Sequence, residues 1–138
     1  QEQDYTAMEG ATSADTAFDF RVGDPAVALS HLDLIHAMLD DPNMTIEGEQ
    51  PEIAVVFIGP SVNLITTEED AASATEPEIA EKIAEMQADG VRFEVCLTAA
   101  HALDVPANAI LPEIIQVGNG WISLVGYQQN GYAMIADF

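Results

Sequence analysis

Stretches of apolar residues along the chain predict strands that alternate with helices. Residues 18–22 alternate between apolar and polar side chains, and residues 53–58 form a continuous, β-branched apolar run. The first pattern is typical of a strand with one polar face, and the second of a strand buried on both faces of a parallel sheet. Further strands are predicted over residues 91–96, 113–117 and 132–136.

Helix signals occupy the gaps between these strands. Asp24-Pro25 has N-cap and first-turn chemistry, and the helix that it starts ends at Asp40. Thr75-Glu76-Pro77-Glu78 has capping-box spacing before a second helix, which Gly90 closes. Shorter helices are predicted at about Leu97–Leu103 and between Gly120 and Gly131.

The alternation of strands and helices indicates right-handed crossovers and therefore a parallel sheet with helices on both faces. A length of 138 residues allows one domain of ordinary size. We therefore predict a single three-layer α/β domain over residues 17–138, with a mainly parallel sheet of about five strands and a flavodoxin-like topology. Residues 1–16 are polar, small and acidic without a sustained period, which predicts a flexible arm.

The charge excludes whole classes of partner. The chain has 24 Asp and Glu against 3 Lys and Arg, a formal net charge of −21. Nucleic acids and anionic membrane surfaces are bound through Lys and Arg, so neither is expected as a partner. No apolar run approaches the roughly 18 residues that a membrane span needs, so no membrane insertion is expected.

The first residues and the acidity bear on the compartment. The chain starts with Gln1-Glu2-Gln3-Asp4 and has no initiator Met, which is typical of a mature end left by signal-peptide removal. An artificially shortened cytoplasmic chain would start in the same way. Because the acidic residues are scattered, we interpret them mainly as a solvated surface, and we expect an exported, periplasmic protein with a cytoplasmic one as the alternative.

Cofactor and metal signals are weak. The single cysteine excludes an intramolecular disulfide and a thiolate zinc cluster within one chain. His31 and His36 are five residues apart, which is not the i, i+4 spacing of a helical metal pair. Gly118-Asn119-Gly120 lacks the third glycine of a dinucleotide fingerprint and the Lys-Ser or Lys-Thr of a P-loop. We therefore expect neither a metal nor a cofactor.

Ligands of an open α/β sheet collect beyond the carboxyl ends of its strands. Three segments fall there, namely Gly59-Pro60-Ser61, Cys96-Leu97-Thr98 and Gly118-Asn119-Gly120-Trp121. Cys96 ends a strand directly before a helix, where amide N–H groups favour the nucleophilic thiolate. A free cysteine is also commonly a small buried apolar residue. An open thiol would favour chemistry and a sealed one packing.

The neighbours of Cys96 have two interpretations each. His101 lies about one helical turn beyond Cys96 and could approach the thiol, or it could be an ordinary surface histidine. Trp121 could form a wall of the Cys96 pocket, or it could pack elsewhere. Arg92 lies on the same strand face about 13 Å before Cys96, too far to activate it.

Four stretches in this order resemble the DsrE/DsrF-like family. They are Ile53-Ala-Val-Val-Phe-Ile-Gly59-Pro60, Gly90-Val-Arg-Phe-Glu-Val-Cys96, Leu111-Pro-Glu-Ile-Ile-Gln-Val117 with Gly118-Asn-Gly120, and Leu124-Val-Gly-Tyr-Gln128-Gln-Asn-Gly131-Tyr-Ala-Met-Ile135. With the first strand and helix, the resemblance covers about residues 17–138. It implies a compact α/β fold that assembles into trimers or hexamers, and a cysteine, matched by Cys96, that carries sulfur as a persulfide in the sulfur-relay members.

Two hypotheses follow. The first is a sulfur-carrier or sulfurtransferase-like protein that holds sulfane sulfur on Cys96, with a donor and an acceptor thiol as unidentified partners. The second is a non-catalytic homo-oligomeric module for a small ligand or protein partner, with Cys96 structural. The apolar residues of segment 121–127 exceed what one helix face can bury, which favours a homotrimer or homohexamer. Ile58 stands where family members often have a histidine, so any role of that histidine is absent here.

Overall fold

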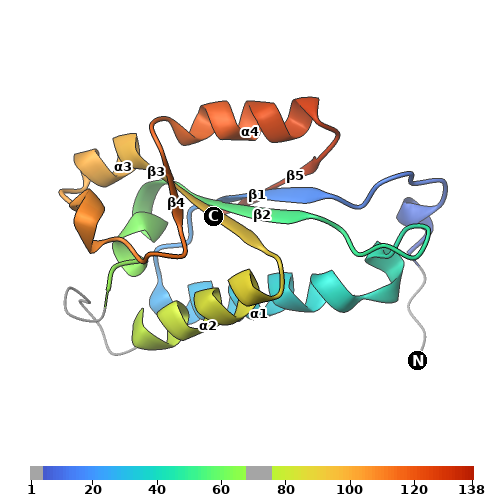
Figure 1. The fold of residues 1–138 in the computed structure, drawn as a ribbon, viewed down its shortest axis with the longest axis horizontal. Coiled ribbons are helices and arrows are strands. Elements are labelled where there is room, and N and C mark those ends of the chain that lie inside the picture. The colour runs from blue at the N-terminus through green and yellow to red at the C-terminus, as the bar shows by residue number, and fades with distance from the viewer. Residues whose placement is uncertain (1–4, 68–75) are drawn as a thin grey trace.

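A computed structural model describes residues 5–67 and 76–138 and shows a five-stranded parallel sheet between layers of helices (Figure 1). The strands are β1 (Thr16–Phe20), β2 (Ile53–Phe57), β3 (Arg92–Cys96), β4 (Ile115–Val117) and β5 (Ala133–Asp137). The α-helices are α1 (Pro25–Asp40), α2 (Glu76–Ala88), α3 (Leu97–Ala102) and α4 (Gly120–Gln129). The prediction of a three-layer α/β domain is confirmed.

The strand order is β4-β3-β2-β1-β5, and all the pairs are parallel. The flavodoxin-like order is 2-1-3-4-5, so that detail of the prediction is wrong. Successive connections from β1 to β4 move in one direction across the sheet, and the connection to β5 returns to the far edge. Because crossovers are right-handed, this reversal places α4 on the face opposite α1 and α2 (Figure 1).

Local sequence signals explain most of the element bounds. The Asp24 carboxylate caps α1 by accepting a hydrogen bond from the Val27 amide at 3.0 Å. Gly90 follows α2 with a φ of 106°, the left-handed conformation expected of a helix-terminating glycine. The capping role predicted for Thr75 lies outside the described residues. At the start of the domain, Ala14 and Thr16 are buried, so ordered contacts extend into the last residues of the predicted arm.

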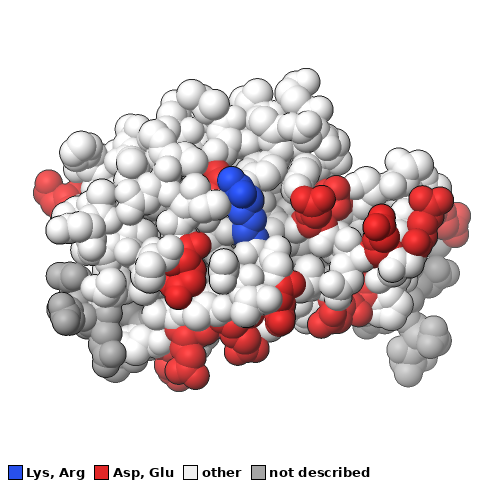
Figure 2. Space-filling model, in the orientation of Figure 1, with Lys and Arg blue, Asp and Glu red and all other residues white. Residues whose placement is uncertain are grey.

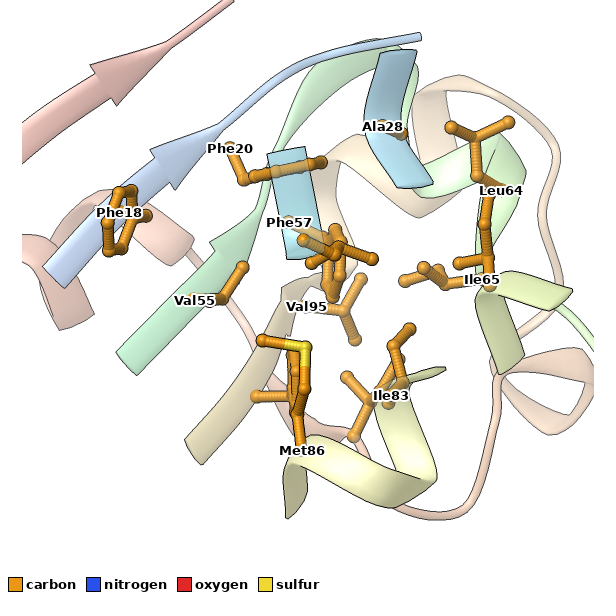
Figure 3. Packing of buried hydrophobic residues seen from close by; sticks show 14 of the residues in the cluster. Phe18, Phe20, Ala28, Val55, Phe57, Leu64, Ile65, Ile83, Met86 and Val95 are labelled. Atoms are coloured by element: carbon orange, nitrogen blue, oxygen red, sulfur yellow. The ribbon is translucent and has the colours of Figure 1, made fainter. Parts of the chain in front are cut away.

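The larger core lies between the sheet and the α1–α2 layer (Figure 3). Phe57 of β2 lies at its centre, with its ring edge-on to Phe20 at 5.3 Å and stacked on Phe93 at 5.9 Å. Helical spacing brings Ile83 and Met86 of α2 against this aromatic row, and both are fully buried. None of the helices in the described ranges has the length and apolar character that a bilayer span requires.

The opposite face of the sheet has a much smaller core. Its buried members are Val56, Ile58 and Cys96, against which Leu124 and Tyr127 of α4 pack. The only residue of α4 that is itself buried is the first, Gly120. The helix therefore rests on the sheet through few apolar contacts, and its position depends on other interactions described below.

Candidate functional site

Cys96 is the last residue of β3 and the N-cap of α3. Its side chain faces the α4 side of the sheet, and the residue is only 5% exposed. The segment Gly118-Asn119-Gly120, named here the glycine turn, covers it, with Cys96 Sγ 4.0 Å from the Gly118 carbonyl oxygen. The candidate nucleophile is therefore sealed, which is the arrangement expected of a packing cysteine.

Gly120 allows the glycine turn to lie directly on the cysteine. A Cβ atom at this position would lie 3.0 Å from Cys96 Cβ and 3.2 Å from Ile58 side-chain atoms. Contacts that short force neighbouring atoms to move, so only glycine fits here without strain. The glycine turn therefore covers the thiol with backbone, next to the side chains of Ile58, Leu124 and Tyr127.

The first turn of α3 is bonded to the glycine turn and not to the thiol. The Thr98 amide and hydroxyl both donate to the Gly118 carbonyl oxygen, at 3.0 and 2.9 Å. A capping side chain normally accepts from an amide of this first turn, but Cys96 makes no such bond. The stabilisation of a thiolate by helix amides, which the sequence suggests, therefore requires that Gly118 first moves away.

The segment Gly59-Pro60-Ser61 begins a 3₁₀ helix, Gly59–Leu64, at the carboxyl end of β2. Ser61 is fully buried and donates its hydroxyl to the Phe20 and Ile58 carbonyl oxygens, at 2.7 and 3.1 Å. Both bonds tie strand ends together, so Ser61 has a structural role here. Pro60 is exposed.

His101 and Trp121 lie apart from the thiol. His101 is exposed and borders an apolar hollow of about 110 Å³ whose lining includes Leu97 and Val105 but not Cys96. Trp121 is 62% exposed, although its neighbour Gly120 touches Cys96. Two of the residues that the sequence predicts at a pocket lie at Cys96. Gly120 packs on its Cβ atom, and Thr98 is hydrogen-bonded to the Gly118 carbonyl oxygen that faces the thiol.

Sequence reasoning missed a polar group beside the thiol. Glu94 precedes Cys96 by two residues on the same face of β3 and is 3% exposed. One carboxylate oxygen, Oε2, accepts from Arg92 Nε at 2.9 Å and from the Tyr127 hydroxyl. The other, Oε1, is buried and has no hydrogen-bond partner among the described residues. The available signal was a glutamate two residues before the cysteine in an otherwise buried strand.

The surroundings of Glu94 keep it charged at neutral pH. Burial is the largest single influence and raises the pKa of Glu94, but hydrogen bonds from Ser123, Tyr127 and Arg92 outweigh it, and the pKa is lowered overall. The pKa of Tyr127 moves in the opposite direction, because burial and the hydrogen bond to Glu94 both raise it. Tyr127 therefore remains a donor and Glu94 a carboxylate over the physiological range.

The arrangement holds one thiol in a buried enclosure, with the Glu94 carboxylate on the same face of the strand. Neither His101 nor Trp121 reaches the thiol, and no base is hydrogen-bonded to it among the described residues. Hydrolysis by a cysteine–histidine pair is therefore not supported. Thiol exchange needs only a thiolate and access to it, so it is compatible with this site.

Comparison with known proteins places the chain in a family. A model of the DsrE/DsrF-like family matches residues 3–136. No curated protein matches the chain in sequence.

Three solved structures share the fold. A protein of unknown function, MTH1491 from Methanobacterium thermoautotrophicum, is 21% identical with a TM-score of 0.65, over 88% of this chain and 97% of that one. The protein BT1422 from Bacteroides thetaiotaomicron, also of unknown function, is 18% identical with a TM-score of 0.62, over 92% and 98%. The ychN protein of E. coli is 7% identical with a TM-score of 0.60, over 88% and 97%. The chain described here belongs to the DsrE/DsrF-like family, which is associated with sulfur relay.

Proposed function

We propose that the protein carries sulfane sulfur as a persulfide on Cys96. The observation that carries the proposal is the position of the single thiol, at the carboxyl end of β3 in a domain of this family and under the glycine turn. A change in this short turn can displace the part of the cover that consists of backbone. Once displaced, it leaves the thiol at the edge where α/β sheets bind their ligands.

The chemistry requires no group beyond the two thiols. The Cys96 thiolate attacks the outer sulfur of a donor persulfide, R–S–SH, and the bond between the two donor sulfurs breaks. The donor leaves as a thiolate and takes up the proton that Cys96 released, so the products are Cys96–S–SH and R–SH. An acceptor thiolate then removes the outer sulfur by the same exchange. The partner provides the second thiol, and one cysteine is therefore sufficient.

Loading is tested by intact mass. After incubation with a persulfide or polysulfide donor, the wild-type protein is expected to gain about 32 Da for each sulfur held by Cys96. Cys96→Ser, which keeps the size of the side chain but not its nucleophilicity, is expected to gain nothing. Absence of the adduct on the wild type, or its presence on the serine variant, would refute the proposal.

A specific observation supports the second candidate function, a homo-oligomeric module with Cys96 structural. Trp121, Ile122 and Val125, named here the α4 patch, are 62%, 70% and 58% exposed. Residues 114–136 contain no Asp, Glu, Lys or Arg. Figure 2 shows neither red nor blue over α4, whereas acidic side chains lie across the middle and lower parts of the same view.

The charge of the chain supports a second copy of it as the partner of the α4 patch. Two molecules with a net charge of −21 repel each other over most of their surfaces, and an uncharged apolar face is where they can approach. A basic partner would be attracted to the acidic faces instead. Large exposed apolar side chains within a polar surround are typical of such interfaces. The proposed assembly is a homotrimer or homohexamer.

A charge placed in the α4 patch tests this assembly. Ile122→Glu is expected to weaken association at least about tenfold, because a buried carboxylate without a partner is costly. The matched control is Leu34→Glu on α1, which is 65% exposed and lies outside the patch. Light scattering at micromolar concentration should give a multiple of 14.8 kDa for the wild type and the control and a smaller species for Ile122→Glu. A monomeric wild type would remove this candidate.

A further inference from the structure

The same helix that covers Cys96 is bonded to Glu94. The glycine turn leads directly into α4, whose first residue, Gly120, packs on Cys96. Further along the helix, the Tyr127 hydroxyl donates to the Glu94 carboxylate. Glu94 and Cys96 are about 6.6 Å apart along β3, and Gly120 and Tyr127 are about 10 Å apart along α4. The helix thus lies along the strand and contacts both residues.

Few other contacts hold α4 at this end of the sheet. Its apolar contribution to the smaller core consists of Leu124 and the ring of Tyr127, while the α4 patch faces away from the sheet. The cross-strand neighbours of Glu94 are Val56 on β2 and Ile115 on β4, whose side chains cannot donate a hydrogen bond to the carboxylate. Among the described residues, the side-chain hydrogen bonds to Glu94 therefore come from Arg92 on its own strand and from Tyr127 on α4.

The Glu94 carboxylate has different partners when α4 is closed on the sheet and when it is lifted. In the closed state it accepts bonds from Arg92 and Tyr127, but Oε1 is buried without a partner in the described structure, which costs free energy. When α4 lifts from the sheet, water can reach both oxygens, and the bond from Tyr127 is lost. A closed state held by a few bonds to one incompletely satisfied charge opens locally more easily than the main core.

We propose that Glu94 is a positioning residue which, through Tyr127, anchors α4 and thereby controls access of reagents to Cys96. The proposal deepens the sulfur-carrier function by assigning the control of its site. The anchor acts on access only, so it is measured without any sulfur transfer. Breaking the anchor loosens the start of α4 and the glycine turn, and the thiol becomes reachable while the α1–α2 core stays folded.

Native-state labelling of Cys96 tests the anchor. A neutral disulfide reagent such as 4,4′-dithiodipyridine avoids repulsion by the acidic chain. Tyr127→Phe removes the hydroxyl and keeps the ring, and we expect it to label about tenfold faster than the wild type. Glu94→Gln is expected to change the labelling rate in the same direction.

The matched control is Tyr132→Phe, which removes a hydroxyl that donates to Glu52 at 3.0 Å and keeps the ring that lies 4.9 Å from that of Tyr127. It should label at the wild-type rate. Urea unfolding of each variant separates local from global opening, because local opening accelerates labelling by more than the change in global stability accounts for.

Labelling of Tyr127→Phe at the wild-type rate, or acceleration that only follows global unfolding, would overturn the anchor. If Glu94→Gln does not fold, Tyr127→Phe alone decides.

The anchor and the sulfur-carrier function can fail independently of each other. Faster labelling without persulfide uptake would leave the anchor standing and remove the sulfur carrier, whereas uptake at unchanged access would do the reverse.

Discussion

Phe57→Ala is expected to lower the free energy of unfolding by about 3–5 kcal/mol, the range found for removing a buried phenylalanine ring. Phe57 is 1% exposed and lies between Phe20 and Phe93, with contacts to both rings. The strands on either side are fixed by the parallel ladder, so the cavity can collapse only partly. Urea denaturation followed by circular dichroism measures the loss.

The control for this change is Phe138→Ala. Phe138 is 76% exposed, and its described partner is the Arg21 guanidinium, 5.5 Å from the ring centre. Its removal is expected to cost no more than about 1 kcal/mol. Equal losses at the two positions would contradict a core centred on β2.

Gly120→Ala is expected to destabilise the protein by about 1–3 kcal/mol, the usual cost of adding a methyl group to a packed site. The new Cβ atom would lie 3.0 Å from Cys96 Cβ, and the strand backbone holds that atom in place. The glycine turn must therefore shift outward, and Cys96 should react faster with 4,4′-dithiodipyridine. Denaturation and labelling of the same sample measure both effects.

A second glycine of α4 provides a control for which no loss of stability is expected. Gly126 also lies in α4, but a Cβ atom there would meet nothing within 4 Å. Gly126→Ala is expected to be neutral or to stabilise by up to about 1 kcal/mol, because alanine favours the helix. A Gly120→Ala variant that is as stable as Gly126→Ala, with Cys96 still protected, would show that the turn does not seal the thiol by close contact.

Much of the fold can be predicted because local patterns and the core agree. Asp24 and Pro25 carry the chemistry of a helix start, and α1 begins there. The run from Ile53 to Ile58 is apolar on both faces, and every residue in it is buried. The strand order is harder to predict, because each helix length is compatible with a move in either direction across the sheet. The reversal before β5 depends on how the layers pack together.

The site is less predictable, because it depends on contacts between distant segments. Position alone places Cys96 at the carboxyl end of a strand, where the structure has it. Its burial depends on Gly120, which is 24 residues further along the chain and belongs to a crossover between opposite sheet edges. Glu94 is charged, and its residue type predicts a solvated face, yet it is buried with one oxygen bonded to Tyr127 and Arg92. Neither the contact of Cys96 with Gly120 nor that of Glu94 with Tyr127 can be recognised from the local sequence.

The net charge of −21 is spread unevenly along the chain. Residues 114–136, which include the α4 patch, contain no Asp, Glu, Lys or Arg, and the glycine turn within them covers the only cysteine of the chain. Cys96 is enclosed by this turn and by apolar side chains, and the Glu94 carboxylate lies two residues away on the same face of β3. The proposed sulfur exchange would therefore take place beneath an uncharged segment, with one carboxylate close by.

Discharge of a loaded Cys96 tests the sulfur-carrier claim most directly, because a carrier must release what it binds. The protein is incubated with polysulfide, freed of excess donor, exposed to a small acceptor thiol and followed by intact mass. The expected result is a gain of about 32 Da that is lost again when the acceptor is added, with Cys96→Ser unchanged throughout. A wild-type protein that never gains the mass, or that keeps it in the presence of the acceptor, would contradict a carrier function for Cys96.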